Sequence, residues 1–235
     1  MKLIDAFFEL LYPPRCMVCD EPTMDYGCCD DCKDKIKTIS TNVCLGCGCE
    51  TKFCECNKRV YHFDGVVAPY FNVDYAQQTV YDLKFNGKFN CLKPFSKEMA
   101  RFAKKSFGTE NIDFICYVPA SVESLYKRGF NQSELFAREI SKLLNIEIKH
   151  NLLFKKKSVK TQHRKRTIED RFKNVRNGFK ATEKLYGKNI LLVDDIKTTG
   201  ATIDECARQL KFAGAERVYC VVALISEKTQ GNELF

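Results

Sequence analysis

Residues 190–202 read ILLVDDIKTTGAT, and this stretch decides the expected fold. Four consecutive aliphatic residues indicate a strand that is buried on both faces, as in a parallel sheet. The strand is expected to reach the surface at Asp194 and Asp195, and the residues that follow, TIDECARQLKFAGA, have the apolar spacing of a helix. Because ligands of open α/β sheets bind beyond the carboxyl ends of the strands, a binding site is predicted at this point.

The segment between the acids and the helix has the composition of an anion site. Free N–H groups at a helix N-terminus favour a bound phosphate, and a glycine lets the backbone approach it closely. Two adjacent carboxylates can accept hydrogen bonds from neighbouring sugar hydroxyls, so the pattern indicates a phosphorylated sugar. An ordinary strand-loop-helix with two capping aspartates is the alternative. The loop residues are Thr198, Thr199, Gly200, Ala201 and Thr202.

Cysteine usage divides the chain. Of fourteen cysteines in 235 residues, ten lie between Cys16 and Cys56. The preceding LIDAFFELLYPP is interrupted by Asp5 and Glu9, lacks a small-residue cleavage site and is too short to cross a bilayer, so neither a signal peptide nor a transmembrane segment is expected. A cysteine-dense segment without a secretory signal favours metal binding over disulfides, and a cytoplasmic protein.

The cysteine pairs have the spacing of zinc ligands. Each Cys-x-x-Cys presents two thiolates to one tetrahedral ion, and four thiolates leave no open position, so the metal would be structural. The second set closes with an irregular Cys-x-Cys, and Cys28 and Cys49 remain as spares or substitutes. A redox role is the alternative, although these pairs do not lie at a strand-to-helix junction. The expected ligands are Cys16, Cys19, Cys29 and Cys32 for one ion and Cys44, Cys47, Cys54 and Cys56 for a second.

After Cys56 the chain alternates between strand and helix patterns. Strands are expected at GVVAPYF (65–71), DFICYVPAS (113–121), KNILLVDD (188–195) and RVYCVVALI (217–225), and helices at 74–87, 95–108, 131–145 and from 202 onward. This order predicts an α/β fold, a mainly parallel sheet with helices on both faces. We expect a small zinc-ribbon-like module at residues 1–58 and the α/β domain at residues 59–235.

A second anion site is expected where the strand after residue 113 ends. Parallel strands end at one sheet edge, so Pro119, Ala120 and Ser121 should lie near the acid pair. Lys127 and Arg128 follow, and such cations suit a diphosphate, whose charge backbone N–H groups alone do not offset. A solvated basic turn is the alternative.

Positive charge is concentrated between Lys155 and Arg176. This segment holds ten Lys or Arg against two acids, and its excess of eight equals the net charge of +8 of the whole chain. With Phe172 and Phe179 as an aromatic platform, it could bind single-stranded DNA; a plain solvated loop is an alternative. The residues expected to contact nucleic acid are Lys155, Lys156, Lys157, Lys160, Arg164, Lys165, Arg166 and Arg171.

The stretch ILLVDDIKTTGAT resembles the signature of type I phosphoribosyltransferases, which has four apolar residues, two acids, a short spacer and a Thr-Gly phosphate loop. The resemblance implies that fold, with Asp194 and Asp195 on the ribose hydroxyls as catalytic residues. It also implies that Lys197 and the loop after it bind the 5-phosphate of phosphoribosyl pyrophosphate, and that residues 119–121 bind pyrophosphate, with Mg²⁺ beside it. In this class a mobile loop at the position of the basic segment closes over the substrate, which offers another interpretation of its charge.

The chain as a whole is similar to the ComF family of competence proteins, through YPPRCMVCD, RGFNQSELFA, TQHRKRTIEDRFKNVRNGF and ILLVDDIKTTGAT. Members join an N-terminal cysteine zinc module to a phosphoribosyltransferase-like domain. The resemblance implies a role in natural transformation, in which the protein handles incoming single-stranded DNA at the cytoplasmic face of the membrane, beside an uptake helicase or channel.

Two functions are therefore expected. The favoured one is an accessory protein of DNA uptake that binds single-stranded DNA and phosphoribosyl pyrophosphate or a related ligand. The alternative is an active phosphoribosyltransferase that transfers ribose 5-phosphate to a nitrogen acceptor, although no residue set in the sequence identifies an acceptor pocket.

Overall fold

The computed structural model describes residues 14–40, 42–54, 56, 60–156 and 168–226. Its centre is a parallel sheet in the order β1-β7-β6-β3, made of β1 (Gly65–Val67), β7 (Arg217–Ile225), β6 (Asn189–Lys197) and β3 (Phe114–Tyr117). The strand expected at 65–71 is two strands, because β2 (Tyr70–Phe71) pairs farther along β7. Pro69, which lies between them, has no N–H to donate to the ladder.

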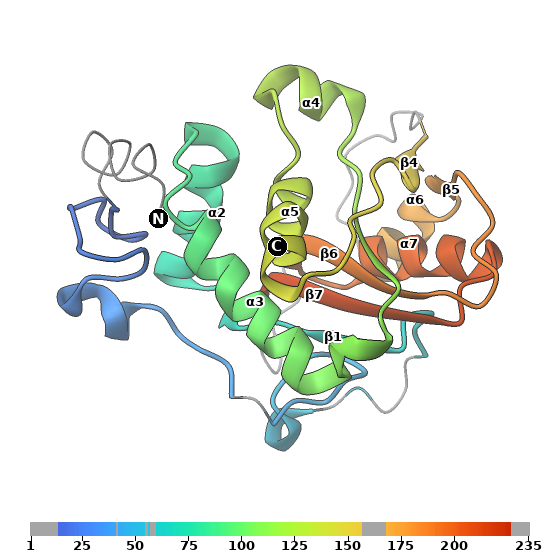
Figure 1. Ribbon diagram of the computed structural model, residues 1–235, viewed down its shortest axis with the longest axis horizontal. Coiled ribbons are helices and arrows are strands. Elements are labelled where there is room, and N and C mark those ends of the chain that lie inside the picture. Colours follow the sequence, from blue (N-terminus) through green and yellow to red (C-terminus); the bar gives the residue numbers. More distant parts are fainter. Residues whose placement is uncertain (1–13, 41, 55, 57–59, 157–167, 227–235) are drawn as a thin grey trace.

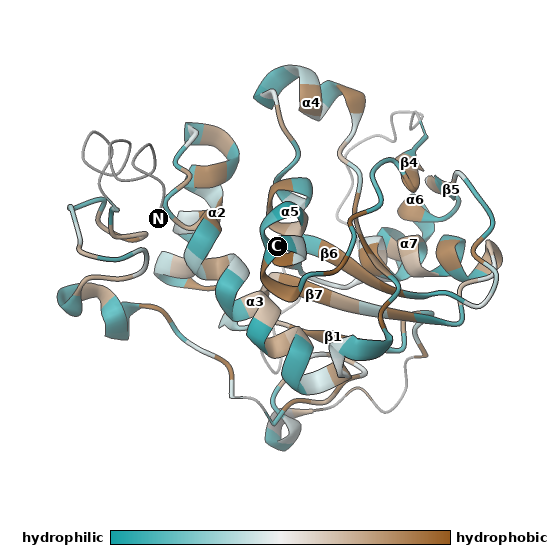
Figure 2. Cartoon of the chain, viewed as in Figure 1, coloured by the Kyte–Doolittle hydropathy of each residue, from teal (hydrophilic) through white to brown (hydrophobic). Residues whose placement is uncertain are grey.

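Helices cover both faces of the sheet, as the strand-helix alternation predicts (Figure 1). One face carries α2 (Asp74–Asn86), α3 (Leu92–Phe107) and α5 (Gln132–Leu144), and the other carries α7 (Ala201–Phe212). Alternate residues of β6 enter the two cores: Leu191 packs with α3 and α5, and Leu192 packs with α7. Figure 2 shows β7 in the brown of hydrophobic residues, which is typical of a strand buried on both faces.

Several short elements had no clear signal in the sequence. They are α4 (Val122–Arg128), α6 (Ile168–Val175), the antiparallel pair β4 (Leu153–Lys155) and β5 (Phe179–Ala181), and the 3₁₀ turns η1 (Asp30–Lys35), η2 (Thr51–Phe53) and η3 (Thr109–Asn111). Helix α4 has no buried residue and so no apolar stripe that a periodicity argument could find. Among the described helices, none combines the length and the apolar character that crossing a bilayer requires.

The cysteine-rich segment packs against the α/β domain at two places. Its first part contacts α2, where the Thr79 hydroxyl donates to the Met17 carbonyl at 3.1 Å. Its second part contacts the sheet edge, where the Val66 N–H donates to the Leu45 carbonyl at 2.8 Å. The module is therefore attached to the same helix and the same strand layer that support the candidate site.

Candidate functional site

The acid pair lies inside β6 and not at its end. Asp194 and Asp195 are only 7% and 9% exposed, and the pairing of β6 with β7 continues through Lys197. The expectation that the strand reaches the surface at the acids is therefore wrong. The ladder extends beyond them, and side chains from α2 and α5 cover the carboxylates.

Each carboxylate is held by a different helix. The Ser133 hydroxyl, at the start of α5, donates to Asp194 Oδ1 at 2.8 Å. Lys84 Nζ, on α2, lies 3.2 Å from Asp195 Oδ2. The N–H of Asp195 donates to Asp194 Oδ1 and the N–H of Ile196 donates to Asp195 Oδ1. These contacts fix the orientation of both acids before any ligand arrives.

Burial makes Asp194 an unusual acid. Burial and, next, the negative charge of Asp195 raise the pKa of its carboxyl to about 7, against the opposing effect of the hydrogen bond from Ser133. Near neutral pH this carboxyl is therefore present in both protonation states. It can donate a hydrogen bond in one state and accept in both.

Asp194→Asn is expected to raise the free energy of unfolding above pH 7. The folded state holds the Asp194 proton more tightly than the unfolded state does, so this stabilising contribution is complete below the unfolded pKa and is lost as the pH rises through about 7. A neutral amide has no such loss, and the difference should be on the order of 3 kcal/mol at about pH 8. Urea unfolding of wild type and variant at about pH 5 and about pH 8 measures it. An identical pH dependence in the two proteins would contradict the assignment.

The loop after β6 has the backbone of an anion site. Gly200 has a φ of +84° and precedes α7, whose first N–H groups have no partners within the helix. A Cβ at Gly200 would lie 3.1 Å from Cε of the flexible Lys197 side chain, so it is the positive φ that favours glycine at this position. Thr199 Oγ1 accepts from the Ala201 N–H at 3.4 Å. The loop predicted as the phosphate site thus forms the start of α7.

Sequence reasoning missed a second group of residues beside this loop. The ring of Tyr61 lies near Gly200 and stacks on Phe63, with 4.6 Å between centroids. The His62 N–H donates to Asp204 Oδ1 at 2.6 Å, and His62 Nδ1 lies 3.1 Å from Asp204 Oδ2 in the first turn of α7. The only signal in the sequence was a short YHF run just after the cysteines.

The turn after β3 begins beside the acid pair. Tyr117 pairs with Val193 across the two strands, so Pro119, Ala120 and Ser121 follow next to Asp194. Ser121 caps α4, since its hydroxyl accepts from the Ser124 N–H at 3.1 Å. The structure therefore brings this turn and the acids together, while the Ser121 hydroxyl already has a local role.

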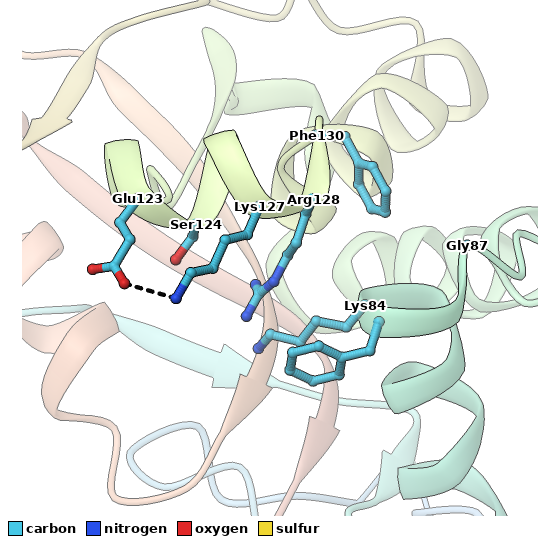
Figure 3. Close-up of a pocket in the computed structure, with 8 residues that line it drawn as sticks. Lys84, Gly87, Glu123, Ser124, Lys127, Arg128 and Phe130 are labelled. Atoms are coloured by element: carbon cyan, nitrogen blue, oxygen red, sulfur yellow. Dashed lines mark hydrogen bonds and ion pairs between the residues drawn. The ribbon is translucent and has the colours of Figure 1, made fainter.

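A cavity of about 450 Å³ opens between α2 and α4 (Figure 3). Arg128, at the end of α4, lines it together with Lys84, which also contacts Asp195. The Gln132 amide lies beside Arg128, with Oε1 3.5 Å from Arg128 Nη1, and its buried Nε2 has no acceptor in the described part of the chain. A buried donor without an acceptor is expected to find one in a ligand or a water molecule.

The basic segment is only partly within the described residues. Lys155 and Lys156 are exposed, and Arg171 lies on α6 and is partly exposed. Phe179 cannot serve as an aromatic platform, because it is 1% exposed and belongs to the core under α7; that expectation is wrong. The residues that lie outside the described ranges are Lys157, Lys160, Arg164, Lys165 and Arg166.

The structure gathers the eight predicted cysteines into two clusters. One contains Cys16, Cys19, Cys29 and Cys32, and the other contains Cys44, Cys47, Cys54 and Cys56; within each, the sulfur atoms all lie within 4.8 Å of one another. Neighbouring sulfurs lie 3.3–3.7 Å apart. Four sulfurs about 2.3 Å from a tetrahedral ion would be separated by about 3.8 Å, so both clusters fit zinc.

The environment of Cys16 suits a thiolate. Burial raises the pKa of this thiol, but hydrogen bonds from backbone N–H groups outweigh burial and bring its pKa to about 6. Two of these donors are the N–H groups of Val18 and Cys29, each 3.4 Å from Cys16 Sγ. Metal ligation requires the deprotonated sulfur, and this loop favours it.

Comparisons with known proteins agree with both halves of this architecture. The model of the phosphoribosyl transferase domain family matches residues 131–234, and the model of the double zinc ribbon domain matches residues 7–60. The chain is 26% identical to the DNA utilization protein YhgH of Escherichia coli K12, over 90% of this chain and 98% of that protein. It is also 26% identical to competence protein F of Haemophilus influenzae, over 82% of this chain and 87% of that protein. Over most of its length the chain is therefore similar to proteins named for DNA utilization and competence, as its resemblance to the ComF family implies.

A third similar protein is competence protein ComFC of Bacillus subtilis, which is 24% identical over 81% of this chain and 80% of its own length. These similarities confirm the resemblance and the fold class expected from the sequence, a phosphoribosyltransferase-like domain preceded by a double zinc ribbon. The matched relatives are named for DNA utilization and competence, which confirms the coarse functional expectation.

Proposed function

We propose that this protein is a cytoplasmic accessory protein of DNA uptake that binds single-stranded DNA and phosphoribosyl pyrophosphate or a related phosphoribosyl ligand. One observation carries the proposal: the acid pair of β6, the Gly200 loop and the turn after β3 meet at one edge of the sheet. Contact with an uptake helicase or a membrane channel is part of the same proposal.

Each group of this edge has a distinct role in the proposed complex. Asp194 and Asp195 accept hydrogen bonds from the ribose hydroxyls, and the loop from Lys197 to Thr202 binds the 5-phosphate at the start of α7. The turn at 119–121 and Arg128 bind the diphosphate. Mg²⁺ would offset diphosphate charge, and the carboxylates are oxygen donors of the kind this ion prefers.

The two cysteine clusters are proposed to hold zinc. Their sulfur separations fit a tetrahedral ion, and both consist of four thiols, so no position remains open for a catalytic water. The metal would therefore supply folding free energy to the module and not chemistry. In the proposed protein the module supports α2 and offers a surface to protein partners.

A second candidate function is transfer of ribose 5-phosphate to a nitrogen acceptor. The observation that favours it is the raised pKa of Asp194, because strongly perturbed carboxyls in a cleft are typical of catalytic sites. Calorimetric titration with phosphoribosyl pyrophosphate, followed by a turnover assay with nucleobases and DNA ends, separates the two. Binding without pyrophosphate release supports the accessory protein, and turnover supports the enzyme.

Neutralising Lys155, Lys156, Lys157 and Arg164 with glutamine is expected to weaken single-stranded DNA binding for all sequences alike. The slope of the logarithm of the binding constant against the logarithm of the salt concentration should become shallower by about 0.7 for each DNA phosphate that the variant no longer neutralises. Salt-titrated fluorescence anisotropy on a labelled oligonucleotide measures both quantities. If the segment is instead a substrate lid, DNA binding stays intact while phosphoribosyl pyrophosphate affinity or turnover falls.

A matched control removes four positive charges from exposed positions on α3 and α5, at Lys97, Lys104, Lys105 and Lys142. This variant has the same net charge as the first but keeps the basic segment. Equal salt slopes for the two variants would show that the effect is one of net charge alone, and the assignment of this segment would be wrong.

A further inference from the structure

The cavity between α2 and α4 combines positive charge with aromatic surface. Its lining includes Lys84, Phe85, Ser124, Lys127, Arg128 and Phe130. A volume of about 450 Å³ lies within the range that single small-molecule sites occupy. The residues come from two segments that are far apart in the chain, LKFNG at 83–87 and ESLYKRGF at 123–130. The fold therefore creates this site, and the local sequence does not.

Positive charge converges on the cavity from both helices. Figure 3 shows Lys84 and Arg128 pointing toward one another from α2 and α4. Lys84 is paired with Asp195 and Lys127 with the exposed Glu123, but no carboxylate of the described residues lies within ion-pair distance of Arg128. Like charges that face each other across a cavity repel, so an anion there is favourable.

Aromatic rings line the same region and remain exposed. Phe85 is 53% exposed and Phe89 is 47% exposed, and neither side chain belongs to the core. The Arg128 guanidinium lies 4.7 Å from the Phe85 ring centroid, and Phe89 pairs with Phe130 at 5.3 Å. Phe85 also contacts the ring of Tyr81, with 4.6 Å between centroids, and Tyr81 is 51% exposed. The exposed parts of these rings and of the guanidinium are surfaces on which a planar ligand can stack.

We propose that this cavity binds one nucleotide of a single DNA strand, with the base against Phe85 and the phosphate on Arg128, so that the strand and the diphosphate of phosphoribosyl pyrophosphate compete for this guanidinium. The inference rests on the proposed DNA-binding function and names this cavity as a point at which the protein contacts the strand. Stacking surfaces beside a positively charged groove are the physical basis of single-strand binding that tolerates many sequences. The cavity supplies the aromatic platform that Phe179, buried in the core, cannot. It also places the strand next to Asp195, through Lys84.

Phe85→Ala tests the stacking contact. Affinity for a fluorescein-labelled oligothymidylate should fall about tenfold, which is the effect of removing one base-aromatic stack. The salt slope should not change, because the cations that neutralise the DNA phosphates are all retained, and Phe85→Tyr should restore affinity because it keeps the ring. Arg128→Gln should weaken binding and also lower the salt slope by about 0.7. Fluorescence of 2-aminopurine in the strand should be quenched by wild type and less by Phe85→Ala.

Phe212→Ala is the matched control. Phe212 is also exposed and also carries an arginine over its ring, with Arg208 at 4.8 Å, but it lies on α7 on the other face of the sheet. The Phe212→Ala variant should bind the strand with the affinity of wild type. If its affinity falls as much as that of Phe85→Ala, the inference is overturned, because the loss would then follow from removing any exposed aromatic residue.

The outcomes separate this inference from the function on which it rests. If wild type does not bind the oligonucleotide, the proposed DNA function fails and the inference fails with it. If wild type binds and Phe85→Ala and Arg128→Gln bind equally well, the inference alone is overturned. Thymidine monophosphate is the second probe: if it binds as tightly as the strand and with the same dependence on Phe85, the cavity takes a free nucleotide and the strand assignment is wrong.

Discussion

Cys16→Ser or Cys29→Ser is expected to release zinc and to unfold residues 16–56. Coordination of a structural zinc ion contributes about 10–16 kcal/mol to the folding of small zinc domains. The module has little else to replace it: among its described residues, Ile36 and Ile39 are the buried apolar side chains other than cysteine. Metal analysis should show a loss of zinc, and hydrogen exchange should show lower protection across the module.

Cys28→Ser is the matched control, because Cys28 is adjacent to Cys29 and lies outside both clusters. Cys49→Ser is expected to have a smaller effect for the same reason. Unchanged zinc content in both Cys16→Ser and Cys29→Ser would refute the metal assignment. Loss of zinc should also reduce protection in α2, because Thr79 would lose its contact with Met17 of the module and keep only its hydrogen bond to the Tyr75 carbonyl within the helix.

The double variant Asp194→Asn, Asp195→Asn is expected to lose most of its affinity for phosphoribosyl pyrophosphate. The amides keep the shape of the side chains but remove the charged acceptors, and removing each charged hydrogen bond should cost about 1.5–3 kcal/mol. Asn at position 195 also loses the ion pair with Lys84. Isothermal titration calorimetry measures the affinity, and thermal unfolding should show that the fold is intact.

Glu110→Gln with Glu216→Gln is a suitable control, since it removes two carboxylates from exposed positions. It should bind the ligand as wild type does. Wild-type affinity in the Asp194 and Asp195 double variant would exclude ribose binding at this part of β6, and the phosphoribosyl assignment would then have no support from the acid pair.

The local sequence was sufficient to predict the structure of segments with one strong signal, such as an aliphatic run, an Asn-Gly pair or paired cysteines. The aliphatic run before Asp194 predicted a strand buried on both faces, and β6 is one. Gly87 ends α2 in the left-handed conformation, as the Asn-Gly signal predicts. The spacing of the cysteines was enough to predict both clusters, because two thiols in a short loop can face one ion without any help from the rest of the chain.

The local sequence gave wrong predictions where contacts with distant segments decide whether a side chain is buried. The charge of Asp194 and Asp195 indicated a strand end at the surface, but a ladder with β7 and contacts from Ser133 and Lys84 bury both acids. Phe179 looked like a platform for bases because aromatic residues follow a basic run, yet β5 turns it into the core. Neither outcome is encoded within a few residues of the position concerned.

The sequence by itself determined the class of fold, the two-part organisation and the positions of the acid pair, of the glycine loop before α7 and of the clustered cysteines. These depend on contiguous residues whose spacing has a direct physical meaning. The tertiary structure alone decided how the site is assembled: Lys84 reaches Asp195 across 111 positions, and His62 reaches Asp204 across 142. Lys84 and Arg128 likewise line one cavity because the fold places α2 and α4 on either side of it. Side-chain contacts between distant segments follow from packing of the whole core, and a single segment does not specify which partner it will meet.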